Sequence, residues 1–64
     1  MYKNKIAKLR KERGLTQEEL ANLTGVSVGY ISHLENGTRR NPSVEVMNRF
    51  AIALNKTVSE IFFE

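Results

Sequence analysis

The feature that most restricts the fold is a connection of three residues, Gly-Val-Ser at positions 25–27, between two segments with helical apolar spacing. Gly25 can take the left-handed conformation that ends a helix, and Ser27 can accept the first free amide hydrogens of the next helix. Ile31 and Leu34 lie three residues apart in that second segment, so they would share one buried face. Because the connection is short and contains glycine, the two helices are expected to cross steeply.

The rest of the sequence carries the same helical spacing, with no sustained strand-like alternation. Thr16 with Glu19, and Thr57 with Glu60, have the spacing of capping boxes, and Pro42 bars helix continuation before it. The predicted helices cover residues 4–13, run from the cap at Thr16 to Gly25, cover residues 28–36, run from the cap at Ser43 to Asn55, and begin after the cap at Thr57. We therefore expect one all-α domain over residues 1–64, a compact five-helix bundle.

Each predicted helix has apolar residues on one face, which we expect to form a small core with little room for a small-molecule ligand. A chain of this length buries only roughly 60% of its unfolded surface. The residues expected to point inward are Ile6, Leu9, Leu20, Ala21, Ile31 and Leu34, then Val44, Met47, Phe50, Ala51 and Leu54, and finally Val58, Ile61 and Phe62.

The residue inventory argues against catalytic and metal chemistry. The chain has no cysteine and no aspartate, and His33 is its only histidine. Disulfides and thiolate metal sites are excluded, and the spacing suggests neither clustered metal ligands nor an oriented Ser-His-carboxylate set. No apolar run approaches the roughly 20 residues that a membrane span needs. We expect no enzymatic activity, no cofactor or metal, no membrane partner, and a reducing, cytoplasmic location.

The distribution of charge is more informative than the net charge of +3, which favours an anionic partner only weakly. Arg39 and Arg40 lie together in a segment with loop signals, which favours contact with an anion. A second cluster occupies the first thirteen residues, where it forms either a solvated helix face or part of an anion-binding surface. Its members are Lys3, Lys5, Lys8, Arg10, Lys11 and Arg13, opposed only by Glu12.

The predicted helix over residues 28–36 has an outward side without dense charge. Its residues there are small or polar, namely Val28, Gly29, Ser32 and His33. A short connection that contains glycine suits a helix-turn-helix, a motif whose second helix enters the DNA major groove. A helix that lies against base edges needs close approach and hydrogen-bonding groups, whereas a dense positive charge would bind any phosphate equally. We therefore expect these four residues to face bases.

Two stretches give the chain a family resemblance. The segments LTQEELANLTGVSVGYISHLENG and NPSVEVMNRFAIALNKTVSEIFFE resemble the phage repressor and Cro family, the XRE-like group of bacterial regulators. The resemblance covers essentially the whole chain, and the Thr-Gln, Gly-Val-Ser and Glu-Asn-Gly elements stand at the family's spacing. It implies a DNA-binding domain that regulates transcription, as a repressor or controller, by binding a palindromic operator in double-stranded DNA as a dimer.

The resemblance also implies roles for individual residues. It places Val28, Gly29, Ser32 and His33 against bases, and it pairs Arg10 with Glu35. It implies contact with the DNA backbone or an outer base for Gln17, and contact with the DNA backbone for Arg39, Arg40 and Asn41. We expect Thr16 and Tyr30 to contact the backbone as well. The family often has long polar residues at the start of this helix, so Val28 could instead touch a thymine methyl group and Gly29 could allow closer approach. For Tyr30 two roles are considered together: its ring packs against the preceding helix, and its hydroxyl binds a phosphate.

The C-terminal part carries more apolar residues than a five-helix monomer needs. Ile52, Phe62 and Phe63 are therefore expected to form a dimer interface. Leu23 is a further apolar residue at a position where a solvated polar residue is expected, although single exposed hydrophobic residues are common.

Two other classes of function remain open at this point. A module that binds a protein partner would show a large exposed apolar patch and weak DNA binding. A nonspecific nucleic-acid binder would show steep salt dependence without a preferred sequence. The uncharged side of the helix over residues 28–36 is less suited to the second class.

Overall fold

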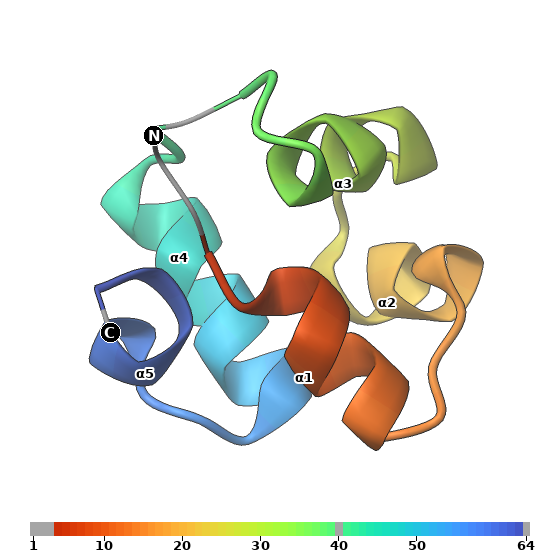
Figure 1. Cartoon of the computed structure of the whole chain (residues 1–64), viewed down its shortest axis with the longest axis horizontal. Coiled ribbons are helices and arrows are strands. Elements are labelled where there is room, and N and C mark those ends of the chain that lie inside the picture. The colour runs from red at the N-terminus through yellow and green to blue at the C-terminus, as the bar shows by residue number, and fades with distance from the viewer. Residues whose placement is uncertain (1–3, 40, 64) are drawn as a thin grey trace.

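Five α-helices follow one another along the part of the chain that the structure, a computed structural model, describes: residues 4–39 and 41–63. They are α1 (Ile6–Glu12), α2 (Gln17–Thr24), α3 (Val28–Glu35), α4 (Val44–Leu54) and α5 (Val58–Phe62). No strand occurs among these residues, so the predicted all-α class is confirmed. In the view of Figure 1, α2 and α3 lie together on the side away from α5.

Four of the helices begin at the hydroxyl residue that the sequence predicts. Thr16 Oγ1 accepts a hydrogen bond from the Glu19 amide at 3.0 Å, and Glu19 Oε1 accepts one from the Thr16 amide at 2.8 Å. Thr57 and Glu60 form the same capping box at the start of α5. Single hydroxyl caps begin the other two helices, Ser27 on α3 and Ser43 on α4. These bonds satisfy amides that no helix carbonyl can reach.

The first helix begins at Ile6, two residues later than the predicted start at Asn4. Asn4 lies outside the helix because its side chain is engaged on both sides. Its Oδ1 accepts a hydrogen bond from the Ile6 amide at 3.0 Å, and its Nδ2 donates to the Leu34 carbonyl at 2.9 Å. The side chain thus ties the start of α1 to the end of α3.

Left-handed residues lie at or just after the ends of four helices, and Gly25, for which the sequence predicts this conformation, is one of them. Gly25 has a φ of 78° at the end of α2, and Asn55 has a φ of 55° at the end of α4. A β-carbon on Gly25 would lie 3.2 Å from Arg49 Nη1. The turn between α2 and α3 therefore uses glycine both for its backbone conformation and for the space that a side chain would take.

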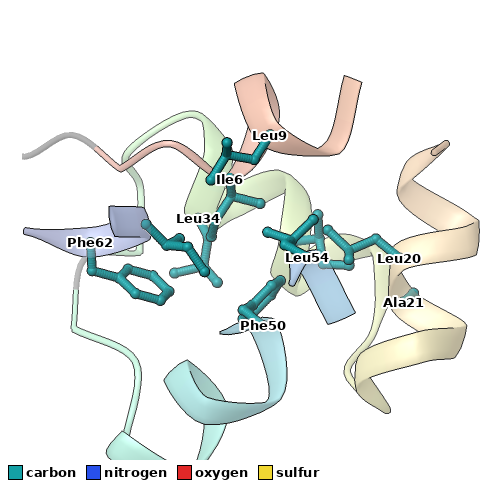
Figure 2. Packing of buried hydrophobic residues seen from close by; sticks show 10 residues of the cluster. Ile6, Leu9, Leu20, Ala21, Leu34, Phe50, Leu54 and Phe62 are labelled. Atoms are coloured by element: carbon teal, nitrogen blue, oxygen red, sulfur yellow. The ribbon is translucent and has the colours of Figure 1, made fainter. Parts of the chain in front are cut away.

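The core forms around α4, which packs against α1, α2 and α5. Figure 2 shows the buried side chains of several helices converging on this region. The rings of Phe50 and Phe62 meet edge to face, with centroids 6.2 Å apart and an interplanar angle of 77°. The buried hydrophobic residues are Ile6, Leu9, Leu20, Ala21, Ile31, Leu34, Phe50, Leu54, Ile61 and Phe62, and all of them were predicted to point inward.

The structure corrects the sequence prediction at Val44 and Phe62. Val44 is 73% exposed, because it is the first residue of α4 and the apolar stripe reaches the core only further along the helix, at Phe50 and Leu54. Phe62 is only 4% exposed. Its ring fills the core of its own chain against Phe50, so Phe62 is not available to the predicted dimer interface.

Candidate nucleic-acid interface

The turn between α2 and α3 is held from the core side. Val26 is half-buried and packs against the core, while Arg49 Nη1 approaches the Thr24 carbonyl at the end of α2 at 3.4 Å. On α3, Ile31 and Leu34 are fully buried. Because these two residues fix one side of α3 to the core, the opposite side of the helix faces solvent.

The four residues predicted to face bases share the outward side of α3. Val28, Gly29 and His33 are exposed, and Ser32 is half-buried. Residues three and four positions apart lie on the same side of a helix, so Val28 with Ser32, and Gly29 with Ser32 and His33, form one surface, to which Gly29 adds no side chain. No carboxylate or permanent cation belongs to it. The contact of this surface with bases remains a prediction.

A hollow of about 610 Å³ lies beside the start of α3, between it and the first turns of α2. Its lining residues are Thr16, Glu18, Glu19, Ala21, Asn22 and Val28. Glu18 and Asn22 were not predicted as site residues, although they line the same hollow as Val28. Their separation of four residues on α2 places them on one face, and that spacing was the only signal in the sequence that could have found them.

Arg10 and Glu35 form an ion pair that joins α1 to the end of α3. Arg10 Nε lies 2.7 Å from Glu35 Oε2, and Arg10 Nη2 donates to Glu35 Oε1 at 3.1 Å. Each side chain is 10% exposed. Arg10 Nη1 also donates to the Leu15 carbonyl at 2.8 Å, and Gln17 Nε2 donates to Glu35 Oε1 at 2.9 Å. The described residues therefore contain a network that fixes α1, α2 and α3 to one another.

The network shifts the pKa values of both charged groups toward the ionised forms. Burial by itself raises the pKa of Glu35, but hydrogen bonds from Arg10 and Gln17 outweigh it and hold that pKa below its ordinary value. The hydrogen bond to Glu35 raises the pKa of Arg10. Both groups therefore stay charged at neutral pH, and the pair remains intact.

Gln17 has a structural partner in addition to its predicted contact with DNA. One hydrogen of its side-chain amide is donated to Glu35. The amide nitrogen carries a second hydrogen, so Gln17 retains a donor that suits a phosphate oxygen. The exposed Thr16 directly precedes it, with its hydroxyl engaged in the cap of α2. The predicted backbone contacts of these two residues remain predictions.

The segment after α3 is bound to the helix more closely than its turn-rich sequence indicates. The Thr38 amide donates to Asn36 Oδ1 at 2.9 Å, and the Arg39 amide donates to the His33 carbonyl at 3.0 Å. The guanidinium carbon of Arg39 lies 5.5 Å from the centroid of the Tyr30 ring. Arg39 is thereby placed beside the outward side of α3.

The remaining residues predicted to contact the DNA backbone are Asn41, Arg40 and Tyr30. Asn41 is exposed in the segment before α4, and Arg40 lies outside the described residues. Tyr30 is half-buried, and its ring packs against the core. The structure leaves the role of its hydroxyl untested.

The basic residues near the N-terminus do not form one uniform surface. Arg10 is buried in its ion pair, whereas Lys8, Lys11 and Arg13 are exposed. Lys5 is half-buried, and Lys3 lies outside the described residues. The exposed members still fit either a solvated helix face or part of an anion-binding surface.

In the described part of the chain, four large apolar residues outside α3 are exposed, and one of them is Val44, described above. Ile52 on α4 is 82% exposed, Phe63 after α5 is 69% exposed, and Leu23 on α2 is also exposed. Of the predicted interface residues, Ile52 and Phe63 thus remain accessible.

Within residues 4–39 and 41–63, no helix is long and apolar enough to cross a membrane, and no three metal-ligating side chains cluster.

Known proteins resemble this chain in both sequence and structure. A family model described as helix-turn-helix matches residues 6–61. The chain is 47% identical over 55 residues to the uncharacterized HTH-type transcriptional regulator y4dJ of Sinorhizobium fredii. The matched residues cover 86% of this chain and 70% of that protein. The restriction-modification controller protein C.AhdI of Aeromonas hydrophila superposes with a TM-score of 0.81 and 36% identity over 88% of this chain and 83% of that one.

A further solved structure is that of SinR, the master regulator for biofilm formation, in complex with DNA. It has a TM-score of 0.81 and 33% identity, and the match covers 84% of this chain and 86% of that one. The chain spans 58% of the full length of SinR from Bacillus subtilis. Sequence match and fold agree, and the chain belongs to the XRE-like helix-turn-helix family of DNA-binding transcriptional regulators.

Proposed function

We propose that this chain binds double-stranded DNA in a sequence-specific manner and represses or controls transcription in the cytoplasm, with α3 in the major groove. The observation that carries the proposal is the outward side of α3. This side is uncharged, and it faces solvent because Ile31 and Leu34 bury the opposite side of α3 in the core. The cation Arg39 lies beside it. Such a surface suits contact with base edges, and its neighbour suits contact with phosphates.

The side chains on α3 define how the bases would be read. The major groove is wide enough for one α-helix, and Gly29 allows the start of α3 to approach the base edges closely. Val28 suits a thymine methyl group, while Ser32 and His33 supply hydrogen-bonding groups. The DNA backbone would be held by Thr16, Gln17, Arg39, Arg40 and Asn41.

A dimer on a palindromic operator is the second part of the proposal. Two recognition helices in successive major grooves must lie about 34 Å apart, which requires a fixed relationship between two copies of the domain. Ile52 and Phe63 are exposed apolar residues outside the helix-turn-helix and are the candidates for this contact. The structure of SinR in complex with DNA supports the proposed ligand class.

Selection of bound sites from random DNA duplexes, followed by mass measurement of the complex, tests both parts. We expect a palindromic consensus and two chains per duplex. Binding without any preferred sequence would overturn the proposed reading role of α3 and favour a nonspecific binder. Absence of DNA binding would overturn the whole proposal and favour a protein-binding module. One chain per duplex would overturn the dimer alone.

A further inference from the structure

The arginine that follows α3 is attached to the helix at two points. The Arg39 amide donates to the His33 carbonyl at 3.0 Å, which fixes its backbone. Its guanidinium carbon lies 5.5 Å from the centroid of the Tyr30 ring, within the range of a cation–π contact. Although Arg39 lies in a turn-rich segment, these two contacts fix its position relative to the outward side of α3.

Tyr30 is well suited to support a neighbouring side chain. It is half-buried, and its ring packs against the hydrophobic core. Its amide donates to Ser27 Oγ at 3.0 Å in the cap of α3. Since the core holds the ring and the cap holds the backbone, Tyr30 offers a fixed aromatic face.

The stacked arrangement leaves the guanidinium able to bind an anion. A guanidinium above a ring is attracted through its face, while its N–H groups lie in its own plane and can donate to phosphate oxygens. The ion pairs among the described residues are Arg10 with Glu35 and Arg49 with Glu45. Arg39 belongs to neither, so neither pair competes with a phosphate for it.

We propose that Tyr30 is a positioning residue for DNA binding: its ring holds the Arg39 guanidinium toward a phosphate, in fixed register with His33 on α3. This inference rests on the DNA binding proposed above and assigns the role to the ring of Tyr30. The alternative role, a phosphate contact made by the tyrosine hydroxyl, becomes an outcome of the test.

The test measures affinity for a random-sequence duplex across a salt series, because a phosphate contact does not require the operator. The variants are Tyr30→Leu, Tyr30→Phe, Arg39→Ala and the double variant Tyr30→Leu with Arg39→Ala. Tyr30→Leu should weaken binding about two- to five-fold relative to the wild type, whereas Tyr30→Phe, which keeps the ring, should bind as tightly as the wild type. In the Arg39→Ala background, Tyr30→Leu should have no further effect. Lys56→Ala removes one exposed cation elsewhere and should weaken binding less than Arg39→Ala.

A measurement without DNA checks the contact itself. The side-chain methylene protons of Arg39 should show an upfield ring-current shift in the NMR spectra of the wild type and Tyr30→Phe, and Tyr30→Leu should lose it while circular dichroism shows a folded chain. Additive effects of Tyr30→Leu and Arg39→Ala, or equal losses in Tyr30→Phe and Tyr30→Leu, would overturn the inference and leave DNA binding standing. A wild type that binds no duplex would overturn the proposed function as well.

Discussion

Arg10 Nε lies 2.7 Å from Glu35 Oε2, and this contact joins α1 to α3 across 25 positions of sequence. Arg10 also reaches the Leu15 carbonyl between α1 and α2, and Gln17 on α2 reaches the same carboxylate. One network of largely buried polar groups therefore binds the two helices of the helix-turn-helix, α2 and α3, to α1. Because every member has a partner, removal of one leaves a charge that is poorly solvated.

Replacement of Arg10 by methionine should destabilise the domain strongly. Removing one partner of a buried ion pair costs about 3–5 kcal/mol, a large share of the stability of so small a domain. For a domain of this size, such a loss lowers the Tm by more than about 10 °C. Thermal unfolding followed by circular dichroism measures the change, and Glu35→Gln should act in the same direction.

The exposed pair of Arg49 and Glu45 provides the matched control. Its side chains are 46% and 75% exposed, so Glu45→Gln should cost less than about 1 kcal/mol. If Arg10→Met changes the Tm as little as Glu45→Gln does, the buried network contributes no more to the stability of the domain than an exposed ion pair does.

The same network predicts a loss of stability in acid. Hydrogen bonds hold the pKa of Glu35 in the folded protein below the ordinary value of 4.5. A carboxyl group of this kind stabilises the fold above its ordinary pKa, and the contribution is lost as the pH falls through the lower folded value. The Tm of the wild type should therefore fall below about pH 4.5, and Glu35→Gln should give a flatter profile.

Part of the acid dependence should survive in Glu35→Gln. Hydrogen bonds from Thr57 in the capping box of α5 also lower the pKa of Glu60. A double variant of Glu35→Gln and Glu60→Gln should be flatter still. A profile for Glu35→Gln that runs parallel to that of the wild type would contradict the assignment to Glu35.

Phe62 and Phe63 are neighbours in sequence with opposite expected effects. Phe62 is in the core, so Phe62→Ala should destabilise the monomer by about 3–5 kcal/mol. Phe63 is exposed, so Phe63→Glu should leave the Tm of the monomer nearly unchanged and shift a dimer toward monomer in sedimentation. Ile52→Lys should have the same effect as Phe63→Glu. A wild type that stays monomeric both free and on DNA would refute the predicted dimer.

The fold was predictable where its signals are local. A capping box depends on two residues three positions apart, so the starts of α2 and α5 could be located from Thr16, Glu19, Thr57 and Glu60 alone. Helical periodicity likewise identified the ten buried hydrophobic residues. These features need no knowledge of how the helices cross.

Features that depend on tertiary placement were predicted less well. The apolar stripe of α4 includes Val44, but where the stripe meets the core depends on the neighbouring helices. The sequence predicted Phe62 to point inward and also to form an interface, and only the packing against Phe50 decides between them. The support of Arg39 by Tyr30 likewise requires the chain to turn back after α3, which no local pattern specifies.

The last prediction separates the reading of bases from the holding of DNA. Arg39 is a permanent cation beside α3, and a phosphate contact carries no sequence information. Arg39→Ala should weaken binding to operator and random DNA alike, and should reduce the slope of log affinity against log salt by about one unit. The substitution leaves the backbone bond from the Arg39 amide to the His33 carbonyl in place, so α3 should keep its structure.

His33→Ala should have the complementary effect. The loss of one base contact costs roughly 1–3 kcal/mol, and only for the correct base. The preference for operator over random DNA should therefore fall, while random-DNA affinity and the salt slope stay nearly unchanged. The decisive quantity is the ratio of operator to random affinity for both variants across a salt series. If Arg39→Ala abolishes that ratio and His33→Ala preserves it, the two roles are reversed and α3 is not the reading helix.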